Sequence, residues 1–297
     1  MSRALVVVNP AAGGGRTGRL WPTLRDDLQR AGLSFECVET AARGDAVRLA
    51  RAAAVAGVEL IVAVGGDGTL NEVVSGVAGG DGTLPRVGAI LTGRGRDAAR
   101  NVGLAADPRV AARRLVDGED VTLDLLRVEW PDGACRWAVN AAGAGFDATV
   151  AARASRGGGR GTLPYVMAVL GALAAHAPVE ATLDADGERV WSGPLTAAVV
   201  ANGAYFGGGM KIAPAADPGD GRLDLVVLGA LGRLELLRWL PSVYRGGHLA
   251  NPKIVARAAR RVTLAAARPL PVHVDGEPAP PTPVTFRVSA GALRLRR

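Results

Sequence analysis

The sequence is poor in cysteine, aromatic residues, lysine and long apolar runs. Its two cysteines, Cys37 and Cys135, lie far apart and outside any Cys-x-x-Cys pair, so neither a zinc site nor a disulfide framework is indicated. The longest apolar stretch, Leu163–Ala175, is interrupted by Pro164 and Gly171 and is too short to cross a bilayer. No signal peptide is apparent. We therefore expect a protein of the reducing cytoplasm that is soluble or peripheral to a membrane.

The charge of the chain points to an anionic partner. Its 35 basic residues are arginines except for Lys211 and Lys253, and they outnumber 28 acidic residues to give a net charge of +7. Such a balance favours nucleotides, nucleic acid or an acidic membrane surface. No RNA- or DNA-binding motif accompanies the charge, so we expect no nucleic acid partner.

The 297 residues, 48% of them hydrophobic, are enough for two folded domains. Short β-branched runs alternate with helical segments over the first 120 residues, which is typical of βαβ units. The expected strands are 4–8, 34–39, 59–64 and 86–91, and the expected helices are 17–31, 44–56, 69–78 and 107–117. Alternating stretches follow at 121–130, 134–142, 179–183, 196–201, 223–228 and 262–266, with helices near 161–176 and 231–243.

This pattern predicts an α/β protein. Residues 1–121 are expected to form a domain with a parallel sheet. Residues 122–297 are expected to form a β-rich domain resembling an antiparallel sandwich. The last residues of the chain can return to the N-terminal domain.

The first glycine-rich loop, 9–18, follows a strand and opens a helix, which is a favourable place for an anion. Gly13, Gly15 and Gly18 also satisfy G-x-G-x-x-G, so a dinucleotide-binding dehydrogenase remains a distant alternative. A P-loop is excluded, because no Gly-Lys-Ser/Thr sequence exists in the chain.

The second loop, Gly65-Gly66-Asp67-Gly68-Thr69, is more specific. Its glycines let the backbone approach a phosphate, and Asp67 is placed to interact with a phosphate-bound cation. We expect Thr69 to cap the following helix and to offer its hydroxyl to an oxyanion.

Six motifs occur in the same order as in a known family: 8–10 (VNP), 65–69 (GGDGT), 139–147 (VNAAGAGFD), 200–214 (VANGAYFGGGMKIAP), 217–224 (DPGDGRLD) and 275–277 (DGE). Through them the chain resembles the diacylglycerol kinase catalytic-domain family, which includes soluble bacterial lipid kinases and sphingosine kinases and is distantly similar to NAD kinases. The resemblance covers nearly the whole chain.

The resemblance implies that residues 1–121 bind a nucleotide and that residues 122–297 hold the lipid or other substrate and the metal. It further implies ATP as phosphoryl donor, Mg²⁺ as cofactor and a lipid hydroxyl as acceptor. It implies that Glu277 is the general base, with Asp275 beside it and Asp67 near the phosphates. The nucleotide-binding residues it implies are Asn9, Pro10, Gly13, Gly65, Gly66, Asp67, Gly68, Thr69, Gly93, Arg94, Arg96 and Asp97. It places a magnesium ion at Asp217, Asp220 and the backbone of Arg222, although a solvated turn explains the same residues. Asp124 matches a family aspartate that is either functional or structural.

The segment after the fourth strand departs from the family pattern. Arg94 replaces a threonine, Arg96 replaces an asparagine, and Gly14 stands where a lysine is common. Either the arginines supply positive charge to the phosphates, or they fill the pocket and silence the protein. Because Asp67, Asp97 and Glu277 all remain, we expect activity.

We therefore expect an ATP- and Mg²⁺-dependent lipid kinase that phosphorylates diacylglycerol or a related lipid at the cytoplasmic, anionic face of a membrane. The alternatives are a kinase of the same fold acting on another alcohol and a catalytically silent nucleotide- or lipid-binding protein. Helix 162–176 either packs in the core or contacts lipid. The three histidines, His176, His248 and His273, receive no role, and a homodimer is left open.

Overall fold

The computed structural model of the protein describes residues 4–79, 84–93, 95–156, 162–174 and 176–297. Arg94 therefore lies outside the described residues. The chain divides into two compact units, an N-terminal unit of Met1–Leu125 with Ala290–Arg297 and a C-terminal unit of Leu126–Ser289. Two strands, β5 (Asp120–Glu129) and β16 (Val284–Arg296), contain residues of both units.

The N-terminal unit alternates strands and helices, as its sequence pattern predicts. Its strands are β1 (Ala4–Val8), β2 (Phe35–Glu39), β3 (Leu60–Gly65) and β4 (Arg86–Leu91). Its helices are α1 (Ala12–Arg30), α2 (Asp45–Val55), α3 (Asp67–Ala78), α4 (Asp97–Val102) and α5 (Pro108–Asp117). The short α4 has no counterpart among the expected helices, because one and a half turns carry too few residues to show a helical period.

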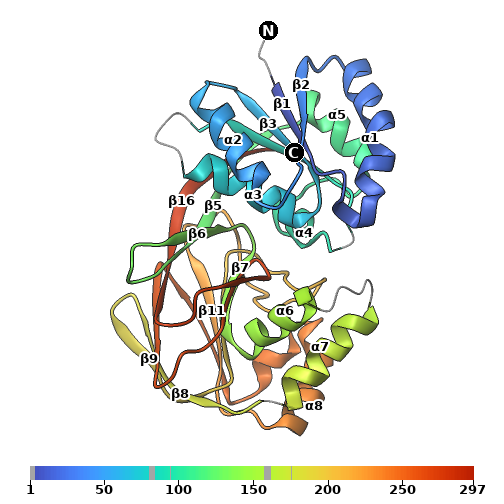
Figure 1. Cartoon of the computed structure of the whole chain (residues 1–297). Helices are drawn as coiled ribbons and strands as arrows, with labels where there is room; N and C mark the ends of the chain where they lie inside the picture. The colour runs from blue at the N-terminus through green and yellow to red at the C-terminus, as the bar shows by residue number, and fades with distance from the viewer. Residues whose placement is uncertain (1–3, 80–83, 94, 157–161, 175) are drawn as a thin grey trace. The chain divides into compact units, whose positions relative to one another are not determined.

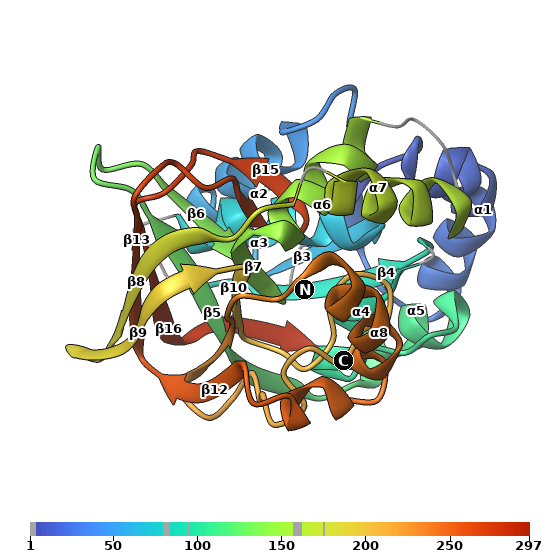
Figure 2. The ribbon, with the colours of Figure 1, turned by 90° about the horizontal axis from the view of Figure 1, so that it is seen from below.

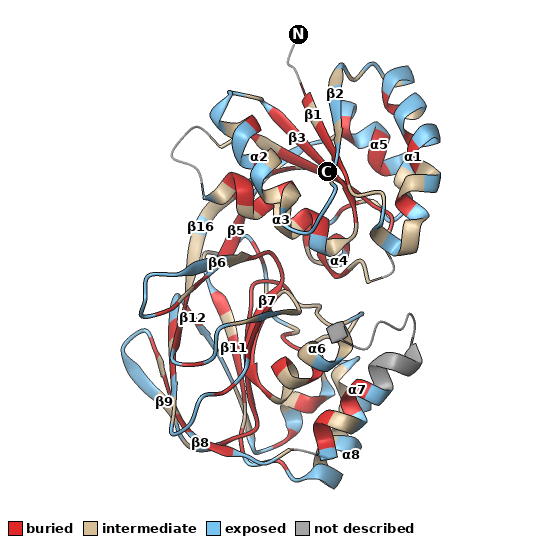
Figure 3. Ribbon diagram, viewed as in Figure 1, coloured by how far each residue is buried: buried red, intermediate tan, exposed pale blue. Residues whose placement is uncertain are grey.

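The strands of this unit form a parallel sheet in the order β2-β1-β3-β4, and the end of β16 pairs parallel with β4. Every residue of β3 is buried, which is the pattern of a strand covered on both faces (Figure 3). Helices α1 and α5 lie on one side of the sheet and α2 and α3 on the other (Figure 1). The carboxyl ends of β1, β3 and β4 therefore lie along one edge, and the loops that follow them are neighbours.

The C-terminal unit is rich in antiparallel strands. Besides parts of β5 and β16, its strands are β6 (Cys135–Ala138), β7 (Ala141–Gly145), β8 (Val179–Ala185), β9 (Glu188–Leu195), β10 (Ala197–Ala201), β11 (Leu223–Leu228), β12 (Ile254–Ala259), β13 (Arg261–Ala266), β14 (Val272–Val274) and β15 (Glu277–Ala279). Its helices are α6 (Phe146–Arg156), α7 (Thr162–Ala174), α8 (Arg233–Val243) and the 3-10 helix η1 (Gly247–Ala250). Helices α6 and α7 lie side by side in both views of the chain (Figures 1 and 2).

Two layers of strands enclose the core of this unit. One layer has the order β12-β11-β10-β7-β14-β15, and the other contains β16, β13, β8 and β9. Phe286, Leu183 and Leu225 are among its fully buried side chains. The α/β fold with a parallel N-terminal sheet and an antiparallel, sandwich-like C-terminal part is therefore confirmed. Among the described residues, no helix is both long and apolar enough to cross a membrane.

The stretch 134–142, expected to be one strand, is two strands, β6 and β7. The backbone leaves the ladder between them because the N–H groups of Val139, Asn140 and Ala141 donate to the carboxylate of Asp275, at 2.8, 3.0 and 3.0 Å. A long-range contact thus ends the first strand and starts the second.

Candidate functional site

The three loops that follow β1, β3 and β4 make the candidate nucleotide site of the N-terminal unit. In the first, Gly13, Gly14 and Gly15 adopt φ angles of +60°, +72° and +79°, which only glycine adopts without strain. The regular part of α1 begins after them, close to the start expected from the sequence. The N–H of Gly15 donates to the carbonyl oxygen of Ala11 at 3.0 Å. Successive left-handed residues form a concave main-chain turn of the kind that favours an anion.

The second loop is held against the first by side chains. The Nδ2 of Asn9 donates to Oγ1 of Thr69 at 3.1 Å, and a Cβ at Gly65 would overlap that same hydroxyl. The expectation that Thr69 caps α3 is wrong. Helix α3 begins at Asp67 with Gly66 as the N-cap residue, so Thr69 lies within the first turn and bonds instead to Asn9.

The third loop packs on the second through a buried threonine. Thr92 is fully buried, and its Oγ1 lies 2.5 Å from Oγ1 of Thr17 and 3.1 Å from the carbonyl oxygen of Gly65. A Cβ at Gly93 would lie 3.2 Å from Cα of Gly66, and one at Gly95 would lie 2.8 Å from Oδ2 of Asp67. The small residues of this loop therefore permit close contact with the Asp67 loop.

Arg96 and Arg100, the described arginines near the third loop, bond within their own segment. Arg96, with φ of +54°, donates from Nε to the carbonyl of Gly93 at 3.2 Å and from Nη1 to that of Ala106 at 3.0 Å. Asp97 is buried and pairs with Arg100 at 2.7 Å. Arg96 thus ties together the two ends of the segment 93–106.

In the C-terminal unit the turn Asp275-Gly276-Glu277 joins β14 to β15. Besides accepting the three N–H groups of residues 139–141, Asp275 donates its own N–H to the carbonyl of Ala141 at 2.9 Å. The φ angles of +46° at Asp275 and +82° at Gly276 turn the chain sharply, so that Glu277 begins β15 in a partly buried position. The Asp275 carboxylate therefore holds the turn in place.

His273 and Asp147, to which the sequence analysis gave no role, lie beside this turn. The Nε2 of His273 is 2.9 Å from Oδ2 of Asp147, and its Nδ1 accepts the N–H of Gly276 at 3.2 Å. His273 stands two residues before the Asp-Gly-Glu motif in the sequence, and this position is the signal that could have identified it as a residue of the site.

The acidic segment 217–224 forms turns of the Asx type. Oδ1 of Asp217 accepts the N–H of Gly219 at 3.0 Å, and Oδ1 of Asp220 accepts that of Arg222 at 2.9 Å. Burial raises the pKa of Asp224, and the neighbouring Asp220 carboxylate raises it further. Hard oxygen donors next to accumulated negative charge fit Mg²⁺, which binds one or two carboxylates and keeps several waters. Among the described residues, no group of three or more His, Cys, Asp or Glu side chains forms a metal cage.

Asp124 has a structural partner. Its Oδ1 accepts the N–H of Gly291 at 2.8 Å, and Gly291 has a φ of +63°. This bond joins β5 to β16 within the N-terminal unit and offsets part of the cost of burying the carboxylate.

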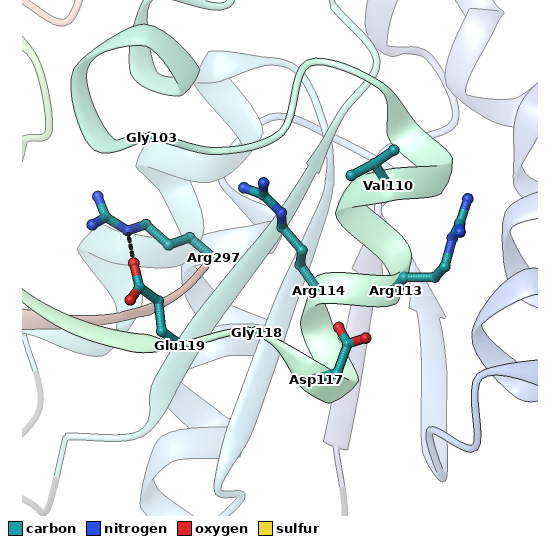
Figure 4. Close-up of a pocket in the computed structure, with 8 residues that line it drawn as sticks. All are labelled: Gly103, Val110, Arg113, Arg114, Asp117, Gly118, Glu119 and Arg297. Atoms are coloured by element: carbon teal, nitrogen blue, oxygen red, sulfur yellow. Dashed lines mark hydrogen bonds and ion pairs between the residues drawn. The ribbon is translucent and has the colours of Figure 1, made fainter.

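A separate hollow of about 620 Å³ lies at the end of α5 (Figure 4). Arg113, Arg114 and Arg297 line it together with Asp117 and Glu119, and Arg297 pairs with Glu119 at 2.9 Å. Its charges are largely balanced, and its lining residues come from outside the three glycine-rich loops, so it is a poor candidate for the nucleotide site.

Comparison with known proteins places the chain in a family. Residues 3–128 match the model of the diacylglycerol kinase catalytic domain, and residues 140–297 match that of the YegS C-terminal NAD kinase beta sandwich-like domain. A diacylglycerol kinase of Mycobacterium tuberculosis is 30% identical over 299 residues, which cover 100% of this chain and 96% of that protein.

Solved structures share the fold. A diacylglycerol kinase structure from Bacillus anthracis superposes with a TM-score of 0.76 at 19% identity, covering 99% of this chain and 96% of that one. An NAD kinase from Archaeoglobus fulgidus in complex with ATP superposes with a TM-score of 0.56 at 16% identity, covering 99% and 93%. Because the two family models together span nearly the whole sequence, the protein belongs to the diacylglycerol kinase catalytic-domain family and is a kinase.

Proposed function

We propose that the protein transfers the γ-phosphoryl group of ATP to a hydroxyl group of diacylglycerol or a related lipid, with Mg²⁺ as cofactor. The observation that carries the proposal is the packing of three glycine-bearing loops at the carboxyl edge of the parallel sheet, with the Asp67 carboxylate beside Gly95. Backbone N–H groups and a carboxylate in this position suit phosphates and their cation. The relative from Mycobacterium tuberculosis, named diacylglycerol kinase, supports the lipid acceptor.

Phosphoryl transfer needs an aligned hydroxyl, a group that takes its proton and positive charge on the phosphates. We assign the proton acceptor to Glu277, because the turn fixes it at the start of β15. Bound Mg²⁺ offsets the negative charge that develops on the phosphates. Asp275 acts by holding the turn, since its carboxylate already accepts three N–H groups. Its assignment among the catalytic residues stays a prediction, and a positioning role fits these contacts better.

The departure at Arg96 is compatible with activity. Its guanidinium donates to two backbone carbonyls of the segment 93–106, so its role in this structure is to fix the loop. An arginine that blocked the nucleotide pocket would have to point into that pocket. Arg96 instead bonds to the backbone of its own segment and stabilises the third loop. We therefore favour an active kinase over a catalytically silent binding protein.

A lipid acceptor requires the protein to reach a membrane surface. Helix α8 exposes Leu234 by 83% and Leu237 by 41%, and Tyr244 just beyond it is 50% exposed. The exposed Arg238 and Arg245 lie in the same segment. Apolar side chains flanked by arginines are typical of segments that lie at an anionic lipid surface. We propose that this face of α8 contacts the inner, anionic face of the cytoplasmic membrane.

Helix α7, expected either to pack in the core or to contact lipid, has two kinds of side chain. Ala168, Val169 and Ala172 are buried, whereas Met167 and Leu170 are 59% and 45% exposed. The buried face stabilises the unit. We propose that the exposed pair adds to the lipid-facing surface.

The test is transfer of radiolabelled phosphate from ATP to vesicles that contain diacylglycerol, with a soluble alcohol panel and a mixed lipid extract assayed in parallel. We expect Mg²⁺-dependent labelling of diacylglycerol by the wild-type protein. Glu277→Gln should lower kcat by about 10²–10⁴-fold and leave ATP affinity unchanged, because a general base acts in the transfer step. Labelling only of a soluble alcohol would favour the alternative substrate class. ATP binding without transfer to any acceptor would favour the silent protein.

A further inference from the structure

His273 is a fully buried histidine whose two ring nitrogens both have partners within the C-terminal unit. Oδ2 of Asp147 lies 2.9 Å from Nε2, and the N–H of Gly276 points to Nδ1 at 3.2 Å. The ring of Phe206 stacks on the imidazole, with centroids 4.8 Å apart and planes 5° from parallel. These contacts fix the position and the rotation of the ring.

The partners also assign the proton of the imidazole. Because the N–H of Gly276 donates to Nδ1, that nitrogen carries no proton, and Nε2 donates to the carboxylate of Asp147. A chain of two hydrogen bonds thus runs from Asp147 at the start of α6, through His273 in β14, to the amide that precedes Glu277.

The arrangement around Asp147 is not one that stability alone explains. Its Oδ1 is buried and has no hydrogen-bond partner among the described residues, which is a cost to folding. A Cβ at Gly143, the residue opposite His273 in β7, would overlap Oδ2 of Asp147. The strand therefore carries glycine where the carboxylate needs room.

We propose that His273 and Asp147 are positioning residues for the general base. Asp147 orients the imidazole of His273, and the imidazole accepts the N–H of Gly276. The pair thereby fixes the backbone of the turn and so the orientation of the Glu277 side chain. This inference rests on the proposed role of Glu277. Asp275 anchors the start of the same turn through residues 139–141, and His273 anchors its second half.

Substitutions at His273 separate the two hydrogen bonds. In His273→Asn the side-chain oxygen takes the place of Nδ1 and still accepts from Gly276, whereas the bond to Asp147 is lost. In His273→Gln the amide nitrogen takes the place of Nε2, and the acceptor for Gly276 is lost. His273→Phe keeps the aromatic stack and loses both bonds. Asp147→Asn keeps an acceptor for Nε2–H and is the matched control for Asp147→Leu.

We expect His273→Phe and His273→Gln to lower kcat by about tenfold or more with an unchanged KM for ATP, since small displacements of a catalytic group have effects of this size. His273→Asn should stay closer to wild type, because its side-chain oxygen accepts from Gly276 without a carboxylate that orients an imidazole. Asp147→Asn should also stay closer to wild type, whereas Asp147→Leu, which leaves the imidazole without its acceptor, should resemble His273→Gln. In a Glu277→Gln background His273→Phe should cause no further loss, because the histidine acts through Glu277. An additive loss in that background, or a His273→Asn variant as slow as His273→Phe, would overturn the proposal.

Hydrogen exchange of the Gly276 amide and ¹⁵N shifts of the imidazole give a readout that needs no kinase activity. We expect the wild type to show protonated Nε2 and a protected Gly276 amide, with protection lost in His273→Phe and kept in His273→Asn. If Gly276 exchanges equally in all three proteins, the pair does not hold the turn. If the exchange results hold but Glu277→Gln keeps wild-type kcat, the turn is held as inferred and the assignment of Glu277 fails instead.

Discussion

At the scale of single residues, the N-terminal loops depend on contacts that only small side chains allow. Asp67 lies so close to Gly95 that a Cβ there would be 2.8 Å from Oδ2, and Thr92 contacts Thr17 and the Gly65 carbonyl. The carboxylate is therefore set among backbone atoms of two loops. This position between two glycine-bearing loops, together with its negative charge, is favourable for binding a cation that is itself bound to phosphate.

Asp67→Asn should weaken ATP binding in a Mg²⁺-dependent manner, because the amide keeps the shape of the side chain but loses the charge that faces the cation. The loss should be on the order of tenfold in Kd, which corresponds to about 1.4 kcal/mol. Calorimetric titration of ATP at several Mg²⁺ concentrations measures it. Asp117→Asn, at the exposed end of α5, is the control and should bind as wild type. Equal affinity of Asp67→Asn at every Mg²⁺ concentration would remove Asp67 from the site.

At the scale of the elements, an ion pair joins the ends of β5 and β16 that belong to the N-terminal unit. Both nitrogens Nε and Nη2 of Arg296 donate to the carboxylate of Asp120, the latter at 3.0 Å. Asp124 and Gly291 form a second link between the same strands. Side chains far apart in sequence therefore fix the register of the last strand.

This pair predicts a pH dependence of stability. The hydrogen bond and charge of Arg296 hold the pKa of Asp120 below its ordinary value, so the folded state favours the ionised carboxylate. Its contribution is present above the ordinary aspartate pKa of about 3.9 and is lost as the pH falls through the lower folded value. Asp120→Asn should cost about 1 kcal/mol at pH 7, and the gap from wild type should close below about pH 4.

Urea unfolding at pH 7 and in the acid range measures the difference. Asp26→Asn, whose carboxylate is exposed in a loose pair with Arg25, is the control and should change stability little at either pH. A gap for Asp120→Asn that persists unchanged into acid would contradict the assignment of the shift to Arg296.

Helix α8 predicts a membrane phenotype. Leu234→Glu should reduce sedimentation with anionic vesicles by about tenfold or more, because a leucine buried in an apolar phase contributes about 1.5–3 kcal/mol and the new carboxylate is repelled by the lipid charge. Val55→Glu, which is 79% exposed on α2, is the matched control and should bind as wild type. If both variants bind equally, α8 is not the contact surface.

At the scale of the whole molecule, the candidate ligand groups are divided between the two units. The glycine-rich loops belong to the N-terminal unit, whereas Asp217, Asp220 and Glu277 belong to the C-terminal unit. Substitutions in the acidic segment should therefore change the response of Tm to Mg²⁺, whereas substitutions in the glycine-rich loops should change the affinity for ATP.

Asp217→Ala and Asp220→Ala should abolish the increase in Tm that Mg²⁺ gives the wild type, with ATP affinity spared, because a cation bound only to the native state stabilises it. At about one hundred times its Kd such a ligand contributes about 2.7 kcal/mol. Asp132→Ala, which removes a similar turn carboxylate in the same unit, is the control. A wild-type melting curve that does not respond to Mg²⁺ would remove the magnesium site.

The sequence alone determined the family and most elements of the N-terminal unit. The strands at 4–8 and 86–91 are where short apolar runs predict them, because a parallel strand covered on both faces is apolar along nearly all of its length. The glycine-rich loops and the Asp-Gly-Glu turn were also evident, since each is a contiguous motif.

Only the tertiary structure decided which distant residues meet. The break between β6 and β7 depends on Asp275, more than 130 positions away, and no local pattern contains that contact. Helix α6 follows a glycine- and alanine-rich strand that has no strong propensity of its own. The pairing of His273 with Asp147 is likewise long-range. Local periodicity reports which face of an element is buried, whereas the partner that buries it is set by the fold of the whole chain.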